Sequence, residues 1–236
     1  MKKALFLCLL AGTLAGGTAM LPAAPAKKAA AARDWTKTVT VTPDGGYRMG
    51  NPAAPVKLVE YGSLTCGACG RFAQEGVPQL VSKYVRTGRV SFEFRNYVRD
   101  PADMAGALLS RCAPTSNYFA LTDRYFTTQQ QWVGRLQGVT EAQKAELEKL
   151  APQDRIARFG TLAGLDTMAA QNGVPAARAK ACLSDRNGMT QLAKIRQVAT
   201  DQHKLDGTPM FLLNGKKLDG VHNWSALEPL LKPPGG

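Results

Sequence analysis

The sequence predicts an α/β fold that carries an inserted all-helical subdomain. Residues 56–61 and 90–97 are apolar, partly β-branched runs typical of strands, and a helix-like run separates them. A strand–helix–strand unit of this kind implies a parallel pair with a right-handed crossover. Residues 101–203 then show helical periodicity without a convincing strand, and strand-like residues return near position 210. The long helical stretch is therefore expected to be an insertion within an α/β domain.

The length and composition are those of a globular chain. With 236 residues, 44% of them hydrophobic and 20% charged, the chain can bury a sizeable core, and we expect one domain with an insertion. The expected segments are a signal peptide at 1–26, a flexible tether at 27–34, the first part of the fold at 35–100, the helical insertion at 101–203 and the second part of the fold at 204–236.

The N-terminus is typical of a secretory signal. Lys2 and Lys3 precede an apolar stretch at 4–10, which continues more weakly through small residues to Ala19. A retained membrane anchor is the alternative, but the stretch falls short of the roughly 20 strongly apolar residues that span a bilayer. We therefore expect export with cleavage after Ala19, Ala24 or Ala26, and Cys8 should leave with the signal.

The elements of the first part follow in order. The turn Asp44-Gly45-Gly46 separates the first strand from the rest. Pro78 lies inside the helical run and is expected to kink it. The predicted elements are strands at 38–41, 56–61 and 90–97 and a helix that follows residue 66 and ends near 85.

Turn and capping signals divide the remainder. Residues 140–143 fit a capping box within the helical insertion. Residues 210–213 and 216–218 flank Asn214-Gly215 and predict a hairpin with a type I′ turn. Residues 225–228 fit a second capping box, which is expected to open a final helix to about Lys232.

The charge does not indicate a nucleic-acid partner. The formal net charge is +12 and becomes +10 without Lys2 and Lys3, but basic and acidic residues are interspersed and no basic run contains aromatic residues. His203 and His222 form no metal or general-base cluster in the sequence, and no Gly-rich phosphate loop is present. A generally basic surface is the simpler interpretation.

The sequence Cys66-Gly67-Ala68-Cys69 is the strongest chemical signal. It lies at the start of the helix that follows residues 56–61, where unpaired backbone N–H groups and the helix dipole lower the pKa of a thiol. Cys66 is thus the expected nucleophile. Cys69, one turn later, can attack a mixed disulfide formed through Cys66 and release the partner.

The segment Gly207-Thr208-Pro209 opens the predicted hairpin. A proline at the first residue of a strand can be a simple edge feature. It can also be a cis-proline whose preceding backbone faces an active-site disulfide and pairs with an extended peptide. The dithiol and the order of the strands favour the second interpretation.

Taken together, these motifs resemble the thioredoxin-fold proteins of the DsbA type, the bacterial periplasmic thiol oxidases and their relatives. The resemblance covers about residues 47–232. It depends on the segment 60–65 before the dithiol, the helical insertion, and Thr208-Pro209 before the terminal hairpin. It implies a thioredoxin fold and a periplasmic location.

The resemblance also implies roles for individual residues. Cys66 would be the exposed nucleophile, Cys69 the buried resolving thiol, and Glu60 the buried acid that eases proton movement to and from Cys69. A surface carboxylate is the alternative for Glu60, since burial of an isolated charge is costly. Thr208 and Pro209 would form the substrate-facing loop.

The residues between the cysteines depart from the family pattern. Many relatives have Pro-His there, whereas this chain has Gly67 and Ala68, which supply no charge or ring donor. We therefore expect the pKa of Cys66 to fall less far. The expected reduction potential lies between those of thioredoxin and DsbA.

Cys112 and Cys182 both fall in the helical insertion. Some relatives have a second disulfide there, and four cysteines remain once Cys8 has left, an even number that suits an oxidising compartment. The resemblance therefore implies a structural disulfide between Cys112 and Cys182. Two buried free thiols are the alternative.

Three functions are compatible with these observations. The first is a monomeric thiol oxidase that donates its Cys66–Cys69 disulfide to reduced, unfolded exported proteins and is reoxidised by a DsbB-type or other membrane redox partner. The second is a periplasmic reductase or isomerase. The third, a metal-binding module, is disfavoured because Cys112 and Cys182 stand far from Cys66 in the sequence. Exchange of this kind requires no dissociable cofactor, and no metal is expected.

Overall fold

The computed structural model of the protein describes residues 33–231. The predicted signal peptide, Cys8, most of the predicted tether and the expected end of the last helix at Lys232 lie outside these residues. Within the described part of the chain, no helix is both long enough and apolar enough to cross a membrane.

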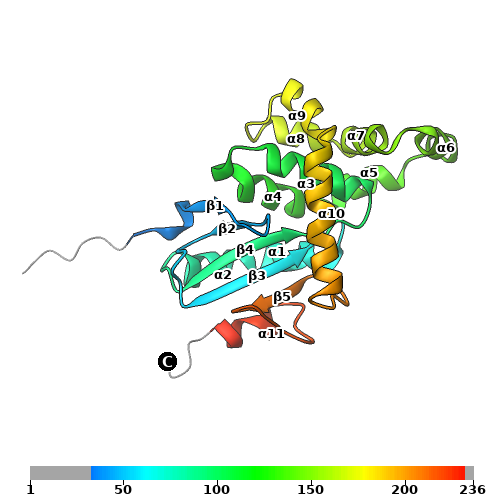
Figure 1. Cartoon of the computed structure of the whole chain (residues 1–236). Coiled ribbons are helices and arrows are strands. Elements are labelled where there is room, and N and C mark those ends of the chain that lie inside the picture. The colour runs from blue at the N-terminus through cyan, green and yellow to red at the C-terminus, as the bar shows by residue number, and fades with distance from the viewer. Residues whose placement is uncertain (1–32, 232–236) are drawn as a thin grey trace, which may run out of the picture. The chain divides into compact units, whose positions relative to one another are not determined.

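A six-stranded sheet forms the centre of the described unit (Figure 1). The strand order is β1-β2-β4-β3-β5-β6, in which β3 and β4 are parallel and every other neighbouring pair is antiparallel. The strands are β1 (Val39–Val41), β2 (Tyr47–Met49), β3 (Val56–Gly62), β4 (Val90–Asn96), β5 (Met210–Leu213) and β6 (Lys216–Lys217).

The two parallel strands are the most buried part of the sheet. Every residue of β4 and all but one residue of β3 are buried, as expected for parallel strands that are covered on both faces. The side chains of Glu60, Glu93 and Arg95 are buried with the apolar residues of these strands. Buried charged groups on two central strands mark this part of the sheet as unusual.

The helix that follows the dithiol ends before Pro78, the residue at which the sequence predicts a kink. Helix α1 (Gly67–Glu75) ends at Gly76, and α2 (Val77–Leu80) leads into a π-helical turn, η2 (Val81–Val85). The predicted kink at Pro78 is thus wrong in position. Pro78 lies in the first turn of α2, where its missing N–H leaves no helical hydrogen bond unmade.

Helices fill the chain between β4 and β5. They are α3 (Pro101–Cys112), α4 (Tyr118–Thr127), α5 (Gln129–Gln137), α6 (Glu141–Lys149), α7 (Pro152–Ala163), α8 (Leu165–Ala170), α9 (Ala176–Leu183) and α10 (Arg186–Asp201), with the short 3₁₀ turn η3 (Thr115–Asn117) before α4. The capping box predicted at Thr140 is present, with both reciprocal hydrogen bonds to Gln143. The long helix α10 runs beside the sheet and returns the chain to β5 (Figure 1).

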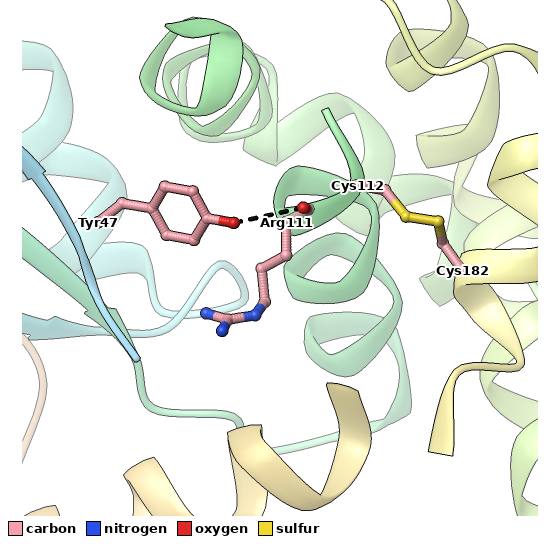
Figure 2. Close-up of a disulfide and its surroundings, with 4 residues drawn as sticks. All are labelled: Tyr47, Arg111, Cys112 and Cys182. Atoms are coloured by element: carbon pink, nitrogen blue, oxygen red, sulfur yellow. Dashed lines mark hydrogen bonds between the residues drawn. A yellow bond between two sulfur atoms is a disulfide. The ribbon is translucent and has the colours of Figure 1, made fainter. Parts of the chain in front are cut away.

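A disulfide joins Cys112, the last residue of α3, to Cys182 in α9, with the two Cα atoms 6.3 Å apart (Figure 2). Beside it, the Tyr47 hydroxyl of β2 donates a hydrogen bond to the carbonyl oxygen of Arg111 at 3.3 Å. The Tyr47 ring also stacks on Tyr118, with the ring centroids 3.6 Å apart. The end of α3 is therefore tied both to α9 and to the sheet.

The chain closes with a hairpin and a short helix. Asn214 and Gly215 have φ angles of 50° and 84°, which a type I′ turn requires. The second predicted capping box is wrong: α11 (Trp224–Leu227) is capped by Asn223, whose side chain accepts a hydrogen bond from the Ala226 N–H. The 3₁₀ turn η4 (Glu228–Leu231) follows.

The remaining 3₁₀ turn, η1 (Trp35–Lys37), precedes β1. The predicted fold class, a thioredoxin fold with an inserted helical region, is confirmed. The sequence does not predict strand β2. Its three residues directly follow a Gly-rich turn and show too little alternation of apolar and polar side chains to indicate a strand.

Candidate active site

The two cysteines of the dithiol lie where β3 gives way to α1. Cys66 is the N-cap residue of α1 and Cys69 lies in its first turn. Both are free thiols. The resemblance implied an exposed nucleophile, but Cys66 is only 8% exposed, while Cys69 is fully buried. Cys66 is therefore the more accessible thiol, although it is not an exposed residue.

The loop before β5 covers Cys66. The Cys66 thiol donates a hydrogen bond to the Thr208 carbonyl oxygen at 3.2 Å, across 142 residues of sequence. The peptide bond between Thr208 and Pro209 is cis. Because β5 pairs with β3, from Leu58 opposite Leu213 to Tyr61 opposite Met210, the residues just before β5 reach the end of β3. The fold thus brings Cys66 and Thr208 together.

The surroundings push the pKa values of the two thiols in opposite directions. A hydrogen bond from the Cys69 thiol is the largest cause that lowers the pKa of Cys66 to about 4, while partial burial opposes it. The backbone N–H groups of Cys69 and Ala68 lower the pKa of Cys66 further. Burial raises the pKa of Cys69 well above its ordinary value. Cys66 is therefore the thiolate of the pair at neutral pH. The hydrogen bond from its thiol to the Thr208 carbonyl oxygen belongs to the protonated form.

Glu60 lies on β3 beneath the dithiol and is 2% exposed. Its register partners are Phe94 on β4 and Phe211 on β5. Burial, and to a smaller extent the charge of Cys66, raises the pKa of Glu60 to about 8. Glu60 also lines a largely apolar pocket of about 460 Å³ between the sheet and α4. The alternative that Glu60 is a surface carboxylate does not fit these surroundings.

The two residues between the cysteines differ in exposure. Gly67 is exposed and Ala68 is half-buried. Gly67 has no side chain that could reach the Cys66 sulfur. A Cβ built at Gly67 would meet only the end of the Arg71 side chain, 3.9 Å away. The low pKa of Cys66 is therefore caused by Cys69, by the Thr208 side chain and by backbone N–H groups rather than by the side chains of these two residues.

A buried carboxylate that the sequence analysis missed holds the segment before Cys66. Asp103, on α3, is fully buried. It accepts hydrogen bonds from the Ser63 hydroxyl at 2.6 Å, from the Leu64 N–H at 2.9 Å and from the Arg99 N–H at 3.0 Å. A single Asp in the first turn of a helix resembles an ordinary cap, so no local signal distinguished it.

Two further side chains at the site also escaped the sequence analysis. Gln129, on α5, donates from Nε2 to the carbonyl oxygens of Leu64 and Cys66. His222 donates from Nδ1 to the Pro209 carbonyl oxygen at 2.8 Å. Both contacts join segments far apart in the sequence, and a lone Gln or His in a polar stretch carries no pattern that reveals such a partner.

Metal ligands are not gathered around the dithiol. Within residues 33–231, no three or more His, Cys, Asp and Glu side chains are placed to hold a metal ion together. Cys112 and Cys182 are already paired with each other.

The sequence and the fold of this chain resemble those of known proteins. A family model described as thioredoxin matches residues 42–233. The crystal structure of a protein-disulfide isomerase from Novosphingobium aromaticivorans is 35% identical, covers 80% of this chain and 96% of that one, and superposes with a TM-score of 0.75. Alpha-DsbA1 of Wolbachia pipientis shares the fold at 21% identity, with a TM-score of 0.57 over 80% of this chain and 90% of that one.

Sequence relatives in Rickettsia are longer than this chain. A protein of Rickettsia prowazekii, named as a candidate protein-disulfide oxidoreductase, is 28% identical over 181 residues, which are 76% of this chain and 58% of that protein. The corresponding protein of Rickettsia felis is 29% identical over 73% of this chain and 54% of its own length. The chain thus spans a little more than half the length of these relatives.

Proposed function

The chain belongs to the thioredoxin family, and from this premise we propose that it is a thiol:disulfide oxidoreductase that introduces disulfides into exported proteins through a Cys66–Cys69 redox-active disulfide. The observation that carries the proposal is the contrast between two adjacent thiols. Cys66 has a pKa lowered to about 4 and is in part accessible, whereas Cys69 is fully buried with a raised pKa.

This contrast favours the donation of a disulfide. At neutral pH the dithiol form carries a stabilised Cys66 thiolate, so the reduced state gains free energy relative to the disulfide. A pair whose reduced state is stabilised is an oxidant. The same thiolate is a good leaving group when a mixed disulfide on Cys66 is resolved.

The exchange proceeds in two steps that balance in atoms and electrons. A substrate thiolate attacks the Cys66 sulfur, the Cys66–Cys69 bond breaks, and Cys69 leaves with the electron pair and takes up a proton. A second substrate thiolate then attacks the substrate sulfur of the mixed disulfide, and Cys66 leaves as the thiolate. The substrate has lost two electrons and gained a disulfide, and the protein holds the dithiol.

Glu60 suits the proton step at Cys69. Its pKa of about 8 lets the carboxyl group hold or release a proton near neutral pH. Cys69, which receives the proton, has a raised pKa to which the charges of Glu60 and Cys66 both contribute. In this proposal Glu60 supplies the proton as Cys69 leaves.

Thr208 and Pro209 form the surface that meets the substrate. The Thr208 carbonyl oxygen lies beside Cys66, where a backbone N–H of an extended peptide can pair with it as an added strand. Recognition through the backbone suits reduced, unfolded proteins of many sequences. The expected setting is the periplasm, with a membrane partner of the DsbB type that reoxidises the dithiol.

The test is the equilibrium reduction potential of the Cys66–Cys69 pair against glutathione, with Cys112 and Cys182 intact. We expect a value between about −120 and −180 mV, the range of the oxidising members of the superfamily. A value near about −270 mV, that of thioredoxin, would contradict disulfide donation. A parallel assay of disulfide formation in a reduced, unfolded protein checks the direction.

A reductase or isomerase is the second candidate, because the structural relative in Novosphingobium carries the name of an isomerase. It is distinguished by the repair of a protein with scrambled disulfides. If the dithiol form rearranges such a protein faster than the disulfide form oxidises a reduced one, isomerisation is the activity. Stoichiometric zinc in the purified protein would instead favour the metal-binding module.

A further inference from the structure

We propose that Gln129 is a positioning residue that sets the redox properties of Cys66 through the backbone of residues 64–66. The proposal rests on the proposed exchange function of the Cys66–Cys69 pair. Gln129 does not touch the Cys66 sulfur in this proposal and acts only on main-chain atoms.

The side chain of Gln129 is built into the site. It is the first residue of α5 and is 7% exposed. Its Nε2 atom donates to the carbonyl oxygen of Leu64 at 2.7 Å and to that of Cys66 at 2.9 Å. Two carbonyl acceptors fix which end of the carboxamide carries the protons. A buried amide therefore clamps the two carbonyl groups on either side of Thr65.

The clamp bears on the thiol because Cys66 is the N-cap of α1. Its carbonyl oxygen also accepts the first helical hydrogen bond, from the Gly70 N–H at 3.0 Å. With that carbonyl held from two sides, the N–H groups of Ala68 and Cys69 stay directed at the Cys66 sulfur, and both favour the thiolate. The carboxamide protons also offset the negative ends of two carbonyl dipoles beside the thiolate.

Gly70 supplies the room that the carboxamide needs. A Cβ built at Gly70 would lie 2.5 Å from Oε1 of Gln129 and 3.0 Å from its Cδ. The φ angle of Gly70 is not positive, so the backbone there does not require glycine and alanine would suit the helix better. The absence of a side chain at Gly70 is thus explained by the approach of Gln129.

Gln129 lines a surface pocket of about 340 Å³ together with Thr65 and Gly67. Gln130, its neighbour on α5, lines the same pocket but is exposed. Gln130 therefore provides a matched control, because it is the same residue type on the same helix but is exposed rather than buried.

The experiment compares Gln129→Met with Gln130→Met in the full chain. Methionine has a similar length but cannot donate a hydrogen bond. The equilibrium constant with glutathione for reduction of the Cys66–Cys69 disulfide should fall about threefold to tenfold in Gln129→Met, as expected for the loss of buried hydrogen bonds. A tenfold change corresponds to about 30 mV. Ultraviolet thiolate absorbance should show a higher pKa for Cys66, while Gln130→Met should match the wild type in both measurements.

Gly70→Ala tests the same clamp from the other side. The added methyl group should displace the flexible end of Gln129 rather than the helix. The equilibrium constant should therefore fall in the same direction. The double variant Gly70→Ala with Gln129→Met should show little further change, because both substitutions remove one interaction.

The outcomes separate this inference from the function on which it rests. If the wild type fails to exchange with glutathione at an oxidising potential, the proposed function is wrong. If the wild type exchanges as expected and Gln129→Met lowers the melting temperature but leaves the potential and the Cys66 pKa unchanged, Gln129 is a structural strut and the inference is overturned. If the effects of Gly70→Ala and Gln129→Met were additive, the two substitutions would not remove one shared interaction, and the proposed clamp would be wrong.

Discussion

The two cysteine pairs of this chain occupy different positions in the fold and are in different states. Cys66 and Cys69 are three positions apart in one turn of α1 and are free thiols. Cys112 and Cys182 are 70 residues apart and join α3 to α9 as a disulfide. The first pair is surrounded by ionisable and polar groups, namely Glu60, Asp103, Gln129 and the Thr208 carbonyl.

The difference shows that position in the fold, rather than the thiol itself, decides what a pair can do. A helix N-terminus and the neighbouring thiol stabilise a thiolate at Cys66, so the first bond is easy to break. The second pair closes a long loop, and such a bond restricts mainly the unfolded chain. One pair is therefore suited to exchange and the other to stability.

Removal of the nucleophile is expected to have the largest effect. Cys66→Ser should reduce disulfide exchange to the uncatalysed rate, because the buried Cys69 cannot replace the accessible thiolate. Oxidation of a reduced, unfolded protein is the measurement. Replacement of both Cys112 and Cys182 by Ser should leave the exchange rate per folded molecule unchanged. If it abolished exchange in folded protein, the assignment of separate roles would be wrong.

The pH dependence of stability should reveal Glu60. Its folded pKa of about 8 exceeds the ordinary glutamate value of 4.5, so its stabilising contribution is complete below about pH 4.5 and is lost as the pH rises towards 8. Glu60→Gln should remove this loss, which amounts to at most about 5 kcal/mol. Urea unfolding of the oxidised protein at pH 5 and about pH 8.5 provides the measurement. The disulfide form lacks the Cys66 charge, so burial alone raises the pKa of Glu60 there.

The control for Glu60 is Glu75→Gln, which makes the same charge change at an exposed position of α1. Its unfolding free energy should keep the pH dependence of the wild type. A Glu60→Gln variant with an unaltered pH dependence would show that the buried carboxyl group titrates at its ordinary pKa.

The second disulfide should act on stability alone. Replacement of both Cys112 and Cys182 by Ala should lower the free energy of unfolding by about 4 kcal/mol, from the entropy of a loop of 70 residues. The potential of the Cys66–Cys69 pair should stay within error of the wild type. A shift of that potential would show that the second disulfide influences the Cys66–Cys69 pair, so the two pairs would not have separate roles.

The smallest expected effect concerns the anchor beside the second disulfide. Tyr47→Phe removes one hydrogen bond to the Arg111 carbonyl (Figure 2) and keeps the stacked ring. The loss of stability should be about 0.5–1 kcal/mol. Thermal unfolding checks it, with Tyr97→Phe, a partly exposed tyrosine directly after β4, as the reference. No change in exchange rate is expected from either variant.

Local patterns predicted much of this molecule. The dithiol, the strands at β3 and β4 and the hairpin turn at Asn214 each have their cause within a few neighbouring residues, so the sequence alone indicates them. The helix break was misplaced because proline is the stronger signal in sequence, while Gly76 ends α1 in the structure. The sequence indicates Ser225 as a cap because Glu228 follows it three residues later, as in a capping box, although Asn223 performs that role.

Contacts across long sequence separations could not be predicted in this way. Gln129 is 63 residues from Cys66, and Asp103 is 39 residues from Leu64. Each becomes part of the site only through hydrogen bonds that join α5 or α3 to the segment 63–66, which follows β3. No spacing rule connects such residues, because the distance along the chain carries no information on which loop a helix will meet.

The position of Thr208, 142 residues after Cys66, has a consequence for the order in which the chain is made. Synthesis proceeds from the N-terminus, so Cys66, Cys69, Cys112 and Cys182 all emerge before β5 exists to pair with β3. During that interval Cys66 lacks its covering loop, and Cys112 and Cys182 are already available to pair with each other. The described structure, with one disulfide and two free thiols, is the outcome in which they do so.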